Sequence, residues 1–316
     1  MTLSLRDRAK AATSALSITL KACTIIIVVG TALFIIALGI ALGVGFGVGG
    51  RTRVTHPVTL APPIFTCDQS AACGCATTQP VFSSRILNGQ TAAFNSWPWI
   101  VYLTNPLSPR TFCTGFIISE RFVLTSTLCV AQYGFNVTVT VGATNFQSLW
   151  GGINVTNSTS ITNLANGISI VTLMTNLTYN SIVKPCCLTT SLSQPAIGTH
   201  GVIAGWGETS ANAIGTPAMN LQQAVVQVVS PNQCGTGSTL GANDTMLCAS
   251  FNSVAACPID AGGPLMVNMN NRWTCVGVIT KQTSCQNQIS FARIAPFVSM
   301  INNITGIYNF PWQLAV

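Results

Sequence analysis

The feature that most constrains the fold is a series of short apolar or alternating runs beyond residue 90, separated by clusters of Gly, Asn, Ser and Pro. Alternating runs are typical of strands, and the residues between them are typical of turns. Many short strands without helices between them predict a β-sandwich or β-barrel. The clearest runs are WPWIVYL, FCTGFIIS, FVLTS, NVTVTVG, ISIVTLM, GVIAGWG, LQQAVVQVVS, PLMV and WTCVGVIT.

One helix is predicted near the C-terminal end of this series. Pro296 suits its first turn, and Gly306 suits the position after its last turn. An apolar stripe on this helix is expected to pack against the core and consists of Phe297, Met300, Ile301 and Ile304.

A long uncharged stretch, residues 22–50, precedes the strand-like runs. An apolar stretch of ~20 residues spans a bilayer, whereas the core of a signal peptide has ~7–15 residues. The stretch therefore predicts a transmembrane signal anchor, with an unusually long cleaved signal peptide as the alternative. Basic residues are more numerous before the stretch than directly after it, which favours a cytoplasmic N-terminus. Glycines spaced for close helix packing offer a face for self-association at Gly39, Gly43 and Gly47.

Charged residues make up only 6% of the chain, and the formal net charge of +7 is unevenly distributed. Seven of the thirteen basic residues precede residue 86, around the apolar stretch. The rest of the chain is close to neutral, which argues against a nucleic-acid partner. The membrane, reached through residues 22–50, is the partner that the charge pattern predicts.

The cysteines and the glycosylation sequons agree on the compartment. Cys23 lies in the apolar stretch, and the other twelve cysteines follow it, an even number that suits an oxidising environment. Six N-x-S/T sequons also follow the stretch, as expected of an extracellular domain. Their asparagines are Asn136, Asn154, Asn157, Asn176, Asn243 and Asn303.

Several motifs in sequence order resemble the chymotrypsin/trypsin-like serine proteases from Cys73 to about Gly306. CGCATTQPVFSSRILNG resembles an activation peptide and its cleavage junction, and SWPWIVYL resembles the first strand of the mature domain. FCTGFIISERFVLTSTLC, GVIAGWGETS and CPIDAGGPL resemble the histidine segment, the strand that opens the second barrel and the nucleophile loop. The resemblance implies an all-β fold of two six-stranded antiparallel barrels with a cleft between them, followed by a C-terminal helix.

This resemblance divides the chain into six parts. We expect, in order, a cytoplasmic tail (1–21), an anchor (22–50), a stalk (51–72), an activation-peptide-like segment (73–85), a trypsin-like domain (86–306) and a C-terminal tail (307–316).

The catalytic residues that the resemblance implies are replaced. Enzymes of this family use a serine nucleophile, a histidine base and an aspartate that orients the histidine. The histidine position holds Leu128, the aspartate position holds Gly167 and the serine position holds Ala261. The chain is therefore predicted to be a pseudoprotease without peptidase activity.

The substrate-binding positions differ from the family pattern as well. A glycine that normally supplies an oxyanion-hole N–H is replaced by Ile259, whose branched side chain restricts the backbone. The base of the specificity pocket corresponds to Ala255, and two wall positions correspond to Gln282 and, less closely, Ile289. Both wall side chains are expected to fill the pocket.

The activation junction, in contrast, keeps the family pattern. Arg85 and Ile86 form a tryptic junction, and Asp260 matches the aspartate that pairs with the new N-terminus after cleavage. A buried carboxylate requires such a partner. Two interpretations stay open: the switch is retained, or Asp260 satisfies nearby backbone groups in the uncut chain.

The resemblance also implies four disulfides: Cys113–Cys129, Cys234–Cys248, Cys257–Cys285 and Cys73–Cys187. A further family bridge would join the positions of Gly201 and Val267, and both of its cysteines are absent. Four cysteines remain with three possible pairings, namely Cys67, Cys75, Cys186 and Cys275.

The two histidines do not replace the lost base, because His56 lies in the stalk and His200 is expected at the end of a strand away from the cleft. No metal-ligand spacing occurs, so neither a metal nor another cofactor is expected. The leading hypothesis is a membrane-anchored extracellular homologue that binds protein, as an adaptor, decoy or cofactor of an active protease. The alternatives are a peptidase of altered mechanism and a structural surface glycoprotein.

Overall fold

The computed structural model contains two compact units, Met1–Val58 and Thr59–Val316, which are described separately. In the second unit it describes residues 67–82, 89–106, 108–131, 136–145, 155–207, 218–235, 244–251, 261–280, 288–306 and 313–314. In the first unit it describes residues 13, 17, 20–22, 24–29 and 31, all of them helical.

The described residues of the first unit are exposed and include a run of apolar side chains from Ile25 to Val29. No helix formed by described residues has both the length and the hydropathy needed to cross a bilayer. Most of the predicted anchor, including Gly39, Gly43 and Gly47, lies outside the described residues.

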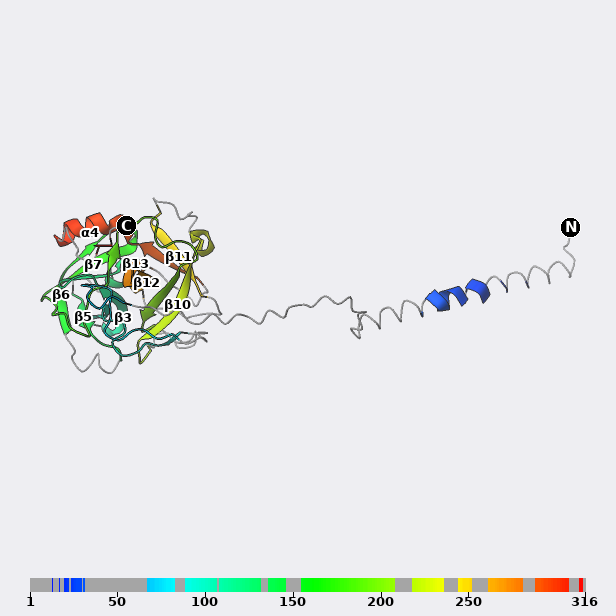
Figure 1. Cartoon of the computed structure of the whole chain (residues 1–316), viewed down its shortest axis with the longest axis horizontal. Helices are drawn as coiled ribbons and strands as arrows, with labels where there is room; N and C mark the ends of the chain where they lie inside the picture. The colour runs from blue at the N-terminus through cyan, green and yellow to red at the C-terminus, as the bar shows by residue number, and fades with distance from the viewer. Residues whose placement is uncertain are drawn as a thin grey trace. The chain divides into compact units, whose positions relative to one another are not determined.

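The first barrel closes in the strand order β2-β3-β4-β7-β6-β5 (Figure 1). Its antiparallel neighbours are far apart in sequence in two places, where β4 pairs with β7 and β2 pairs with β5. The strands are β2 Ile100–Asn105, β3 Ser108–Ile117, β4 Phe122–Ser126, β5 Thr138–Val141, β6 Val155–Asn163 and β7 Ile168–Leu173, and the short helix α2 Thr127–Ala131 follows β4.

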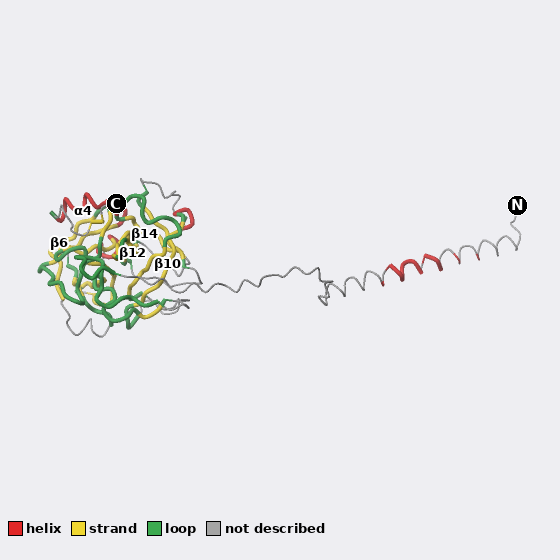
Figure 2. The backbone as a smooth tube through the Cα atoms, viewed as in Figure 1, coloured by secondary structure: helices red, strands yellow, loops and turns green. Residues whose placement is uncertain are grey.

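The second barrel closes in the order β10-β11-β14-β13-β12-β9, because β10 also pairs with β9. The fold therefore has the two six-stranded antiparallel barrels that the resemblance implied, and Figure 2 shows that strands and loops dominate this unit. The strands are β9 His200–Gly205, β10 Gln222–Val229, β11 Met246–Ser250, β12 Pro264–Met269, β13 Arg272–Ile279 and β14 Gln288–Arg293, with β1 Gln90–Thr91 beside β10 and the 3-10 turn η2 Pro231–Cys234.

The predicted C-terminal helix is α4, Val298–Thr305, preceded by the 3-10 turn η3, Ala295–Phe297. It ends at Gly306, whose left-handed backbone donates its N–H to the Asn302 carbonyl. The expected apolar stripe was only partly right. Phe297 and Ile301 are buried, but Met300 and Ile304 are 46% and 36% exposed, because they lie on the solvent side of a helix that packs through Val298 and Ile301.

Part of the predicted C-terminal tail belongs to the fold. β15, Gln313–Leu314, pairs in parallel with β8, Leu188–Thr189. Backbone pairing of a two-residue strand depends little on side-chain type, so no sequence pattern marked it.

Apolar side chains fill both barrels, and three tryptophans stand out in the larger core cluster. Trp97 packs edge-on against Trp99 and Trp273, with ring centroids 5.8 and 4.8 Å apart. The Trp97 indole donates a hydrogen bond to the Gln223 side chain (2.7 Å), and the same Gln223 donates to the Val81 carbonyl (2.8 Å). Gln223 therefore connects the core to the segment that precedes the first barrel.

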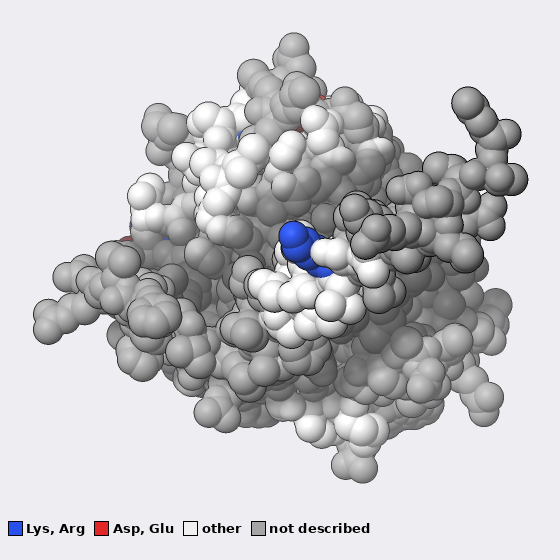
Figure 3. All heavy atoms as spheres, turned by 90° about the vertical axis from the view of Figure 1, so that its right-hand side faces the viewer, with Lys and Arg blue, Asp and Glu red and all other residues white. Residues whose placement is uncertain are grey.

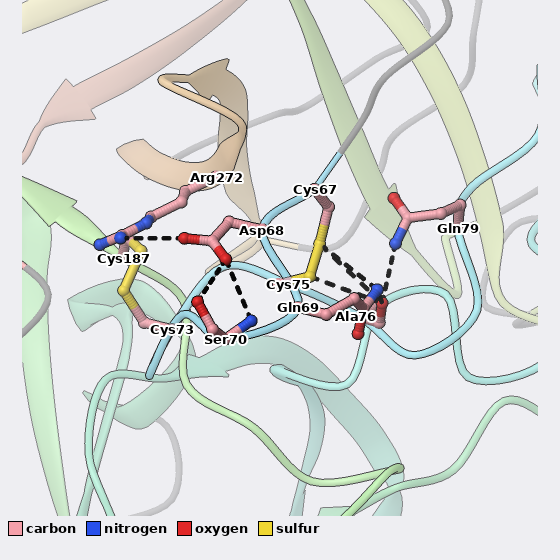
Figure 4. Close-up of a disulfide and its surroundings, with 10 residues drawn as sticks. All are labelled: Cys67, Asp68, Gln69, Ser70, Cys73, Cys75, Ala76, Gln79, Cys187 and Arg272. Carbon is pink, nitrogen blue, oxygen red and sulfur yellow. Dashed lines mark hydrogen bonds and ion pairs between the residues drawn. A yellow bond between two sulfur atoms is a disulfide. The ribbon is translucent and has the colours of Figure 1, made fainter.

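Residues 67–82, here called the N-terminal clasp, are bound tightly to the rest of the second unit. Figure 4 shows the two disulfides of the clasp, Cys67–Cys75 and Cys73–Cys187. The backbone adds bonds from the Gly74 N–H to the Pro185 carbonyl and from the Trp273 N–H to the Gly74 carbonyl. The folded part of the second unit therefore includes the segment that starts at Cys67.

The remaining disulfides resolve the open pairings. The four cysteines whose pairing was open form the disulfides Cys67–Cys75 and Cys186–Cys275. The pairs Cys113–Cys129 and Cys234–Cys248 are present as the resemblance implied. Cys257 and Cys285 lie outside the described residues. A Cβ atom built on Gly201 would lie 3.5 Å from a Val267 methyl group, so the two positions of the absent family bridge are neighbours.

One surface ion pair also holds the clasp, between Asp68 and Arg272 at 3.3 Å. Two hydrogen bonds from Ser70, and then the Arg272 guanidinium, hold the pKa of Asp68 below its ordinary value. A lowered carboxyl pKa contributes stability above the unfolded pKa, and this contribution is lost as pH falls through the folded pKa. We expect Asp68→Asn to lower the thermal midpoint slightly at neutral pH, and we expect this difference to shrink as pH falls through the lowered pKa of Asp68. A difference that stays the same as pH falls would contradict this role of the charge.

Candidate functional site

The first position that the resemblance assigns to a catalytic residue, Leu128, lies in α2 directly after β4. Its side chain is 47% exposed, so it is not held in the core. Its backbone N–H donates to the Ser126 hydroxyl (3.1 Å), and this fully buried hydroxyl donates in turn to the Thr280 carbonyl (3.1 Å). A neutral serine thus satisfies the polar groups beside Leu128.

The second position, Gly167, has a backbone that disfavours other residues. Its φ is +80°, and the preceding Asn166 also has a positive φ of +58°. Most non-glycine residues adopt this conformation at a cost of roughly 1–2 kcal/mol, whereas asparagine and aspartate tolerate it better. A Cβ atom at Gly167 would also lie 3.1 Å from the Thr280 methyl group. An aspartate at this position would therefore be crowded by the Thr280 methyl group.

The third position, Ala261, begins the described part of the nucleophile-like loop. Its carbonyl accepts a hydrogen bond from the Thr114 N–H (3.2 Å) and lies 3.0 Å from the Cys129 sulfur. That sulfur is in the Cys113–Cys129 disulfide and has no hydrogen to donate, so this is a packing contact. Both contacts fix the loop on the first barrel.

The next residue, Gly262, permits this close approach. Its φ is +89°, and its N–H donates to the Ile279 carbonyl (2.7 Å). A Cβ atom there would overlap the Thr114 carbonyl and the Thr125 hydroxyl, which are hydrogen-bonded to each other. Only glycine fits this backbone without displacing its neighbours.

These contacts bring the three positions together. Ser126 and Cys129 flank Leu128, Thr280 lies against Gly167 and bonds Ser126, and Cys129 touches Ala261. The groups in these contacts are hydroxyls, carbonyls, backbone N–H groups and a disulfide. Among the described residues, these contacts include no general base and no nucleophile with an activating partner.

A second hydroxyl chain lies beside the site. Thr127 and Ser169 share a hydrogen bond of 2.9 Å, and Ser169 donates to the Asn163 side chain (2.7 Å). Ser126 and Thr127 were not among the residues singled out from the sequence, although two hydroxyl residues directly before Leu128 are a visible signal in TSTLC.

We expect Ser126→Ala to lower the free energy of unfolding by about 1–2 kcal/mol, because it removes the hydroxyl that pairs the partly buried Leu128 N–H and Thr280 carbonyl. Denaturant unfolding followed by circular dichroism measures this change. Ser160→Ala, at an exposed serine of β6, is the control and should change stability by less than about 0.5 kcal/mol. Equal losses in the two variants would contradict the role of the Ser126 hydroxyl.

The structure places two further residues that the sequence analysis singled out, Ile289 and His200. Ile289 lies in β14, is 1% exposed and packs in the core of the second barrel, so it serves as a packing residue. His200 is exposed at the start of β9, where a strand-end histidine was expected. The part of the chain that the structure describes contains no group of three His, Cys, Asp or Glu that could hold a metal. The positions outside the described residues are Arg85, Ile86, Ala255, Ile259, Asp260 and Gln282.

The face in Figure 3 shows few Lys, Arg, Asp or Glu side chains among the described residues.

Arg293 of β14 is a charged residue that is fully buried. Its guanidinium donates to the carbonyl groups of Leu192, Gln194 (3.1 Å) and Asp244 (3.5 Å), and burial lowers its pKa from the ordinary value. Arg293 thus joins two loops to the second barrel.

Comparison with known proteins agrees with this fold. The trypsin family model matches residues 86–301. The chain is 30% identical to trypsin alpha of Drosophila melanogaster over 220 residues, which are 65% of this chain and 80% of that protein. It is 28% identical to trypsin delta of Drosophila erecta over 219 residues, which are 65% of this chain and 81% of that protein. The chain belongs to the chymotrypsin/trypsin-like serine protease family.

Proposed function

We propose that this chain is a membrane-anchored extracellular serine protease homologue that has lost peptidase activity and acts by binding protein. The observation that carries the proposal is the neutral cluster of Leu128, Gly167 and Ala261, linked through Ser126 and Thr280. Leucine cannot accept a proton, alanine cannot attack a carbonyl and glycine cannot orient an imidazole.

The backbone around Gly167 supports a long divergence from catalysis. A chain that had exchanged only its catalytic side chains would keep a backbone able to accept an aspartate. Here the Thr280 methyl group would crowd the Cβ atom of an aspartate at Gly167. The exposed Leu128 side chain replaces a reactive group with an apolar contact surface.

The extracellular location is supported by five disulfides among the described residues, because disulfides persist in oxidising compartments. The anchor rests on the uncharged stretch 22–50 and its basic flank. The partner we propose is an active protease or another extracellular protein, for which the chain serves as an adaptor, decoy or cofactor.

The test measures peptide hydrolysis and labelling by a fluorophosphonate probe, with full-length protein in detergent. We compare wild type, Ala261→Ser and the triple variant Leu128→His/Gly167→Asp/Ala261→Ser, with trypsin as the positive control. The wild type is expected to be at least about 10⁶-fold less active than trypsin. The triple variant is expected to stay unlabelled, since an aspartate at Gly167 is crowded by the Thr280 methyl group.

Hydrolysis by the wild type that persists after contaminating proteases are inhibited would overturn the proposal and favour a peptidase of altered mechanism. Activity in the triple variant alone would leave the inactivity of the wild type intact. It would, however, contradict the argument that crowding at Gly167 excludes a working triad.

A further inference from the structure

Three of the sequon asparagines lie at one end of the first barrel. Asn136, Asn157 and Asn176 are all exposed, although they are up to 40 positions apart in the sequence. The fourth described sequon asparagine, Asn303, is on α4, and Asn154 and Asn243 lie outside the described residues.

Asn136 and Asn157 are brought together by the pairing of β5 with β6. Thr138, the hydroxyl residue of the Asn136 sequon, is the register partner of Asn157 and donates to its Oδ1 atom (3.1 Å). The backbones of the two sequons are also hydrogen-bonded to each other. The N–H of Ser158, in the Asn157 sequon, donates to the carbonyl of Val137, in the Asn136 sequon (2.9 Å). The two sequons therefore run side by side.

Asn176 joins them through the end of β7. The Met174 N–H donates to the Asn157 carbonyl (2.8 Å), and the hydroxyls of Thr156 and Thr175 share a hydrogen bond of 3.0 Å. Asn176 follows these residues directly, and two residues of extended chain span at most ~7 Å. All three asparagines thus adjoin the same short stretch of backbone around Asn157.

This end of the barrel is distant from the candidate site. β7 begins next to Gly167 and ends before Met174. At ~3.3 Å per residue, the two ends of this strand are about 17 Å apart. The sequons lie at the Met174 end, and Leu128 and Gly167 lie near the other end.

We infer that Asn136, Asn157 and Asn176 carry one cluster of N-linked glycans, which covers the Met174 end of the first barrel and leaves the Leu128 end free of these glycans. The inference rests on the extracellular location in the proposed function. In each transfer the asparagine Nδ2 bonds to the anomeric carbon of a lipid-pyrophosphate oligosaccharide. The lipid pyrophosphate leaves and the amide gives up one proton.

The hydrogen bonding of the cluster is compatible with this chemistry. Thr138 donates to Oδ1 of Asn157, whereas the glycan is attached at Nδ2. The bond can therefore orient the amide before transfer and persist afterwards. A glycan is bulky and solubilising, so three at one end hide the apolar and hydroxyl side chains between them.

Met174 is a natural probe of the cluster, because it lies between Asn157 and Asn176 and is 57% exposed. Dilute hydrogen peroxide transfers one oxygen atom to the methionine sulfur and leaves water, at a rate that follows exposure. Met219, 51% exposed and outside any sequon, is the matched control.

The experiment uses full-length protein from animal cells. Peptide mass spectrometry measures the occupancy of each asparagine and the oxidation rates of both methionines, before and after enzymatic removal of N-glycans.

We expect all three asparagines to be occupied and Met174 oxidation to rise at least about threefold on deglycosylation, with Met219 unchanged. The variant Asn157→Gln should produce part of the rise without enzyme treatment. Occupied asparagines with an unchanged Met174 rate would overturn the cluster but leave the proposed function standing. Three unoccupied asparagines would overturn the inference and count against the extracellular location itself.

Discussion

Replacing Gly262 by alanine is expected to destabilise the protein by at least about 3 kcal/mol. The methyl group would meet the Thr114 carbonyl and the Thr125 hydroxyl at impossibly short distances, and the φ of +89° is itself unfavourable for alanine. The loop that begins at Ala261 would have to leave the first barrel. Denaturant unfolding followed by circular dichroism measures the loss.

Gly198→Ala separates the two causes. Gly198 has nearly the same φ, +90°, but no atom lies within 4 Å of its built Cβ. This variant should lose only the conformational cost, about 1–2 kcal/mol. Equal losses at the two glycines would mean that the close approach to Thr114 contributes nothing.

The second large effect is expected for Arg293→Met, which should lower the free energy of unfolding by about 3 kcal/mol or more. The guanidinium is fully buried and donates to carbonyl groups in two separate loops. Methionine fills much of the volume but leaves these carbonyls without their donor. The loops around Leu192 and Asp244 should exchange their amide protons faster in the variant.

Arg272→Met is the matched control, because Arg272 is partly exposed and makes a surface ion pair with Asp68. Its loss should stay within about 1 kcal/mol. A loss at Arg293 no larger than that at Arg272 would contradict the role of the buried guanidinium.

The fold was predictable because barrel strands repeat a short apolar pattern that sequence displays directly. WPWIVYL and FVLTS became parts of β2 and β4, and Gly306 ended α4 as expected. The predictions that were wrong concerned packing against residues that are distant in sequence. Met300 and Ile304 have the right helical spacing, but the face that packs was set by the position of the helix on the barrel.

The sequence proposed the positions of the candidate site but did not reveal how they are arranged. The motifs located Leu128, Gly167 and Ala261, and the structure brings their surroundings together. The bond of Ser126 to Thr280 joins residues that lie 154 positions apart, and no local pattern announces it. The same reason explains why Arg293 and Gln223, whose partners are carbonyls of distant loops, were not recognised.

The position of Gln223 links the environment of a buried tryptophan to the segment around Val81. Its side-chain amide accepts a hydrogen bond from the Trp97 indole and donates one to the Val81 carbonyl. Val81 lies at the C-terminal end of the clasp. An event that loosens this stretch removes a hydrogen-bond partner from the amide that holds an indole within a three-tryptophan cluster. Intrinsic tryptophan emission should therefore report, without any added dye, an event that loosens the segment around Val81.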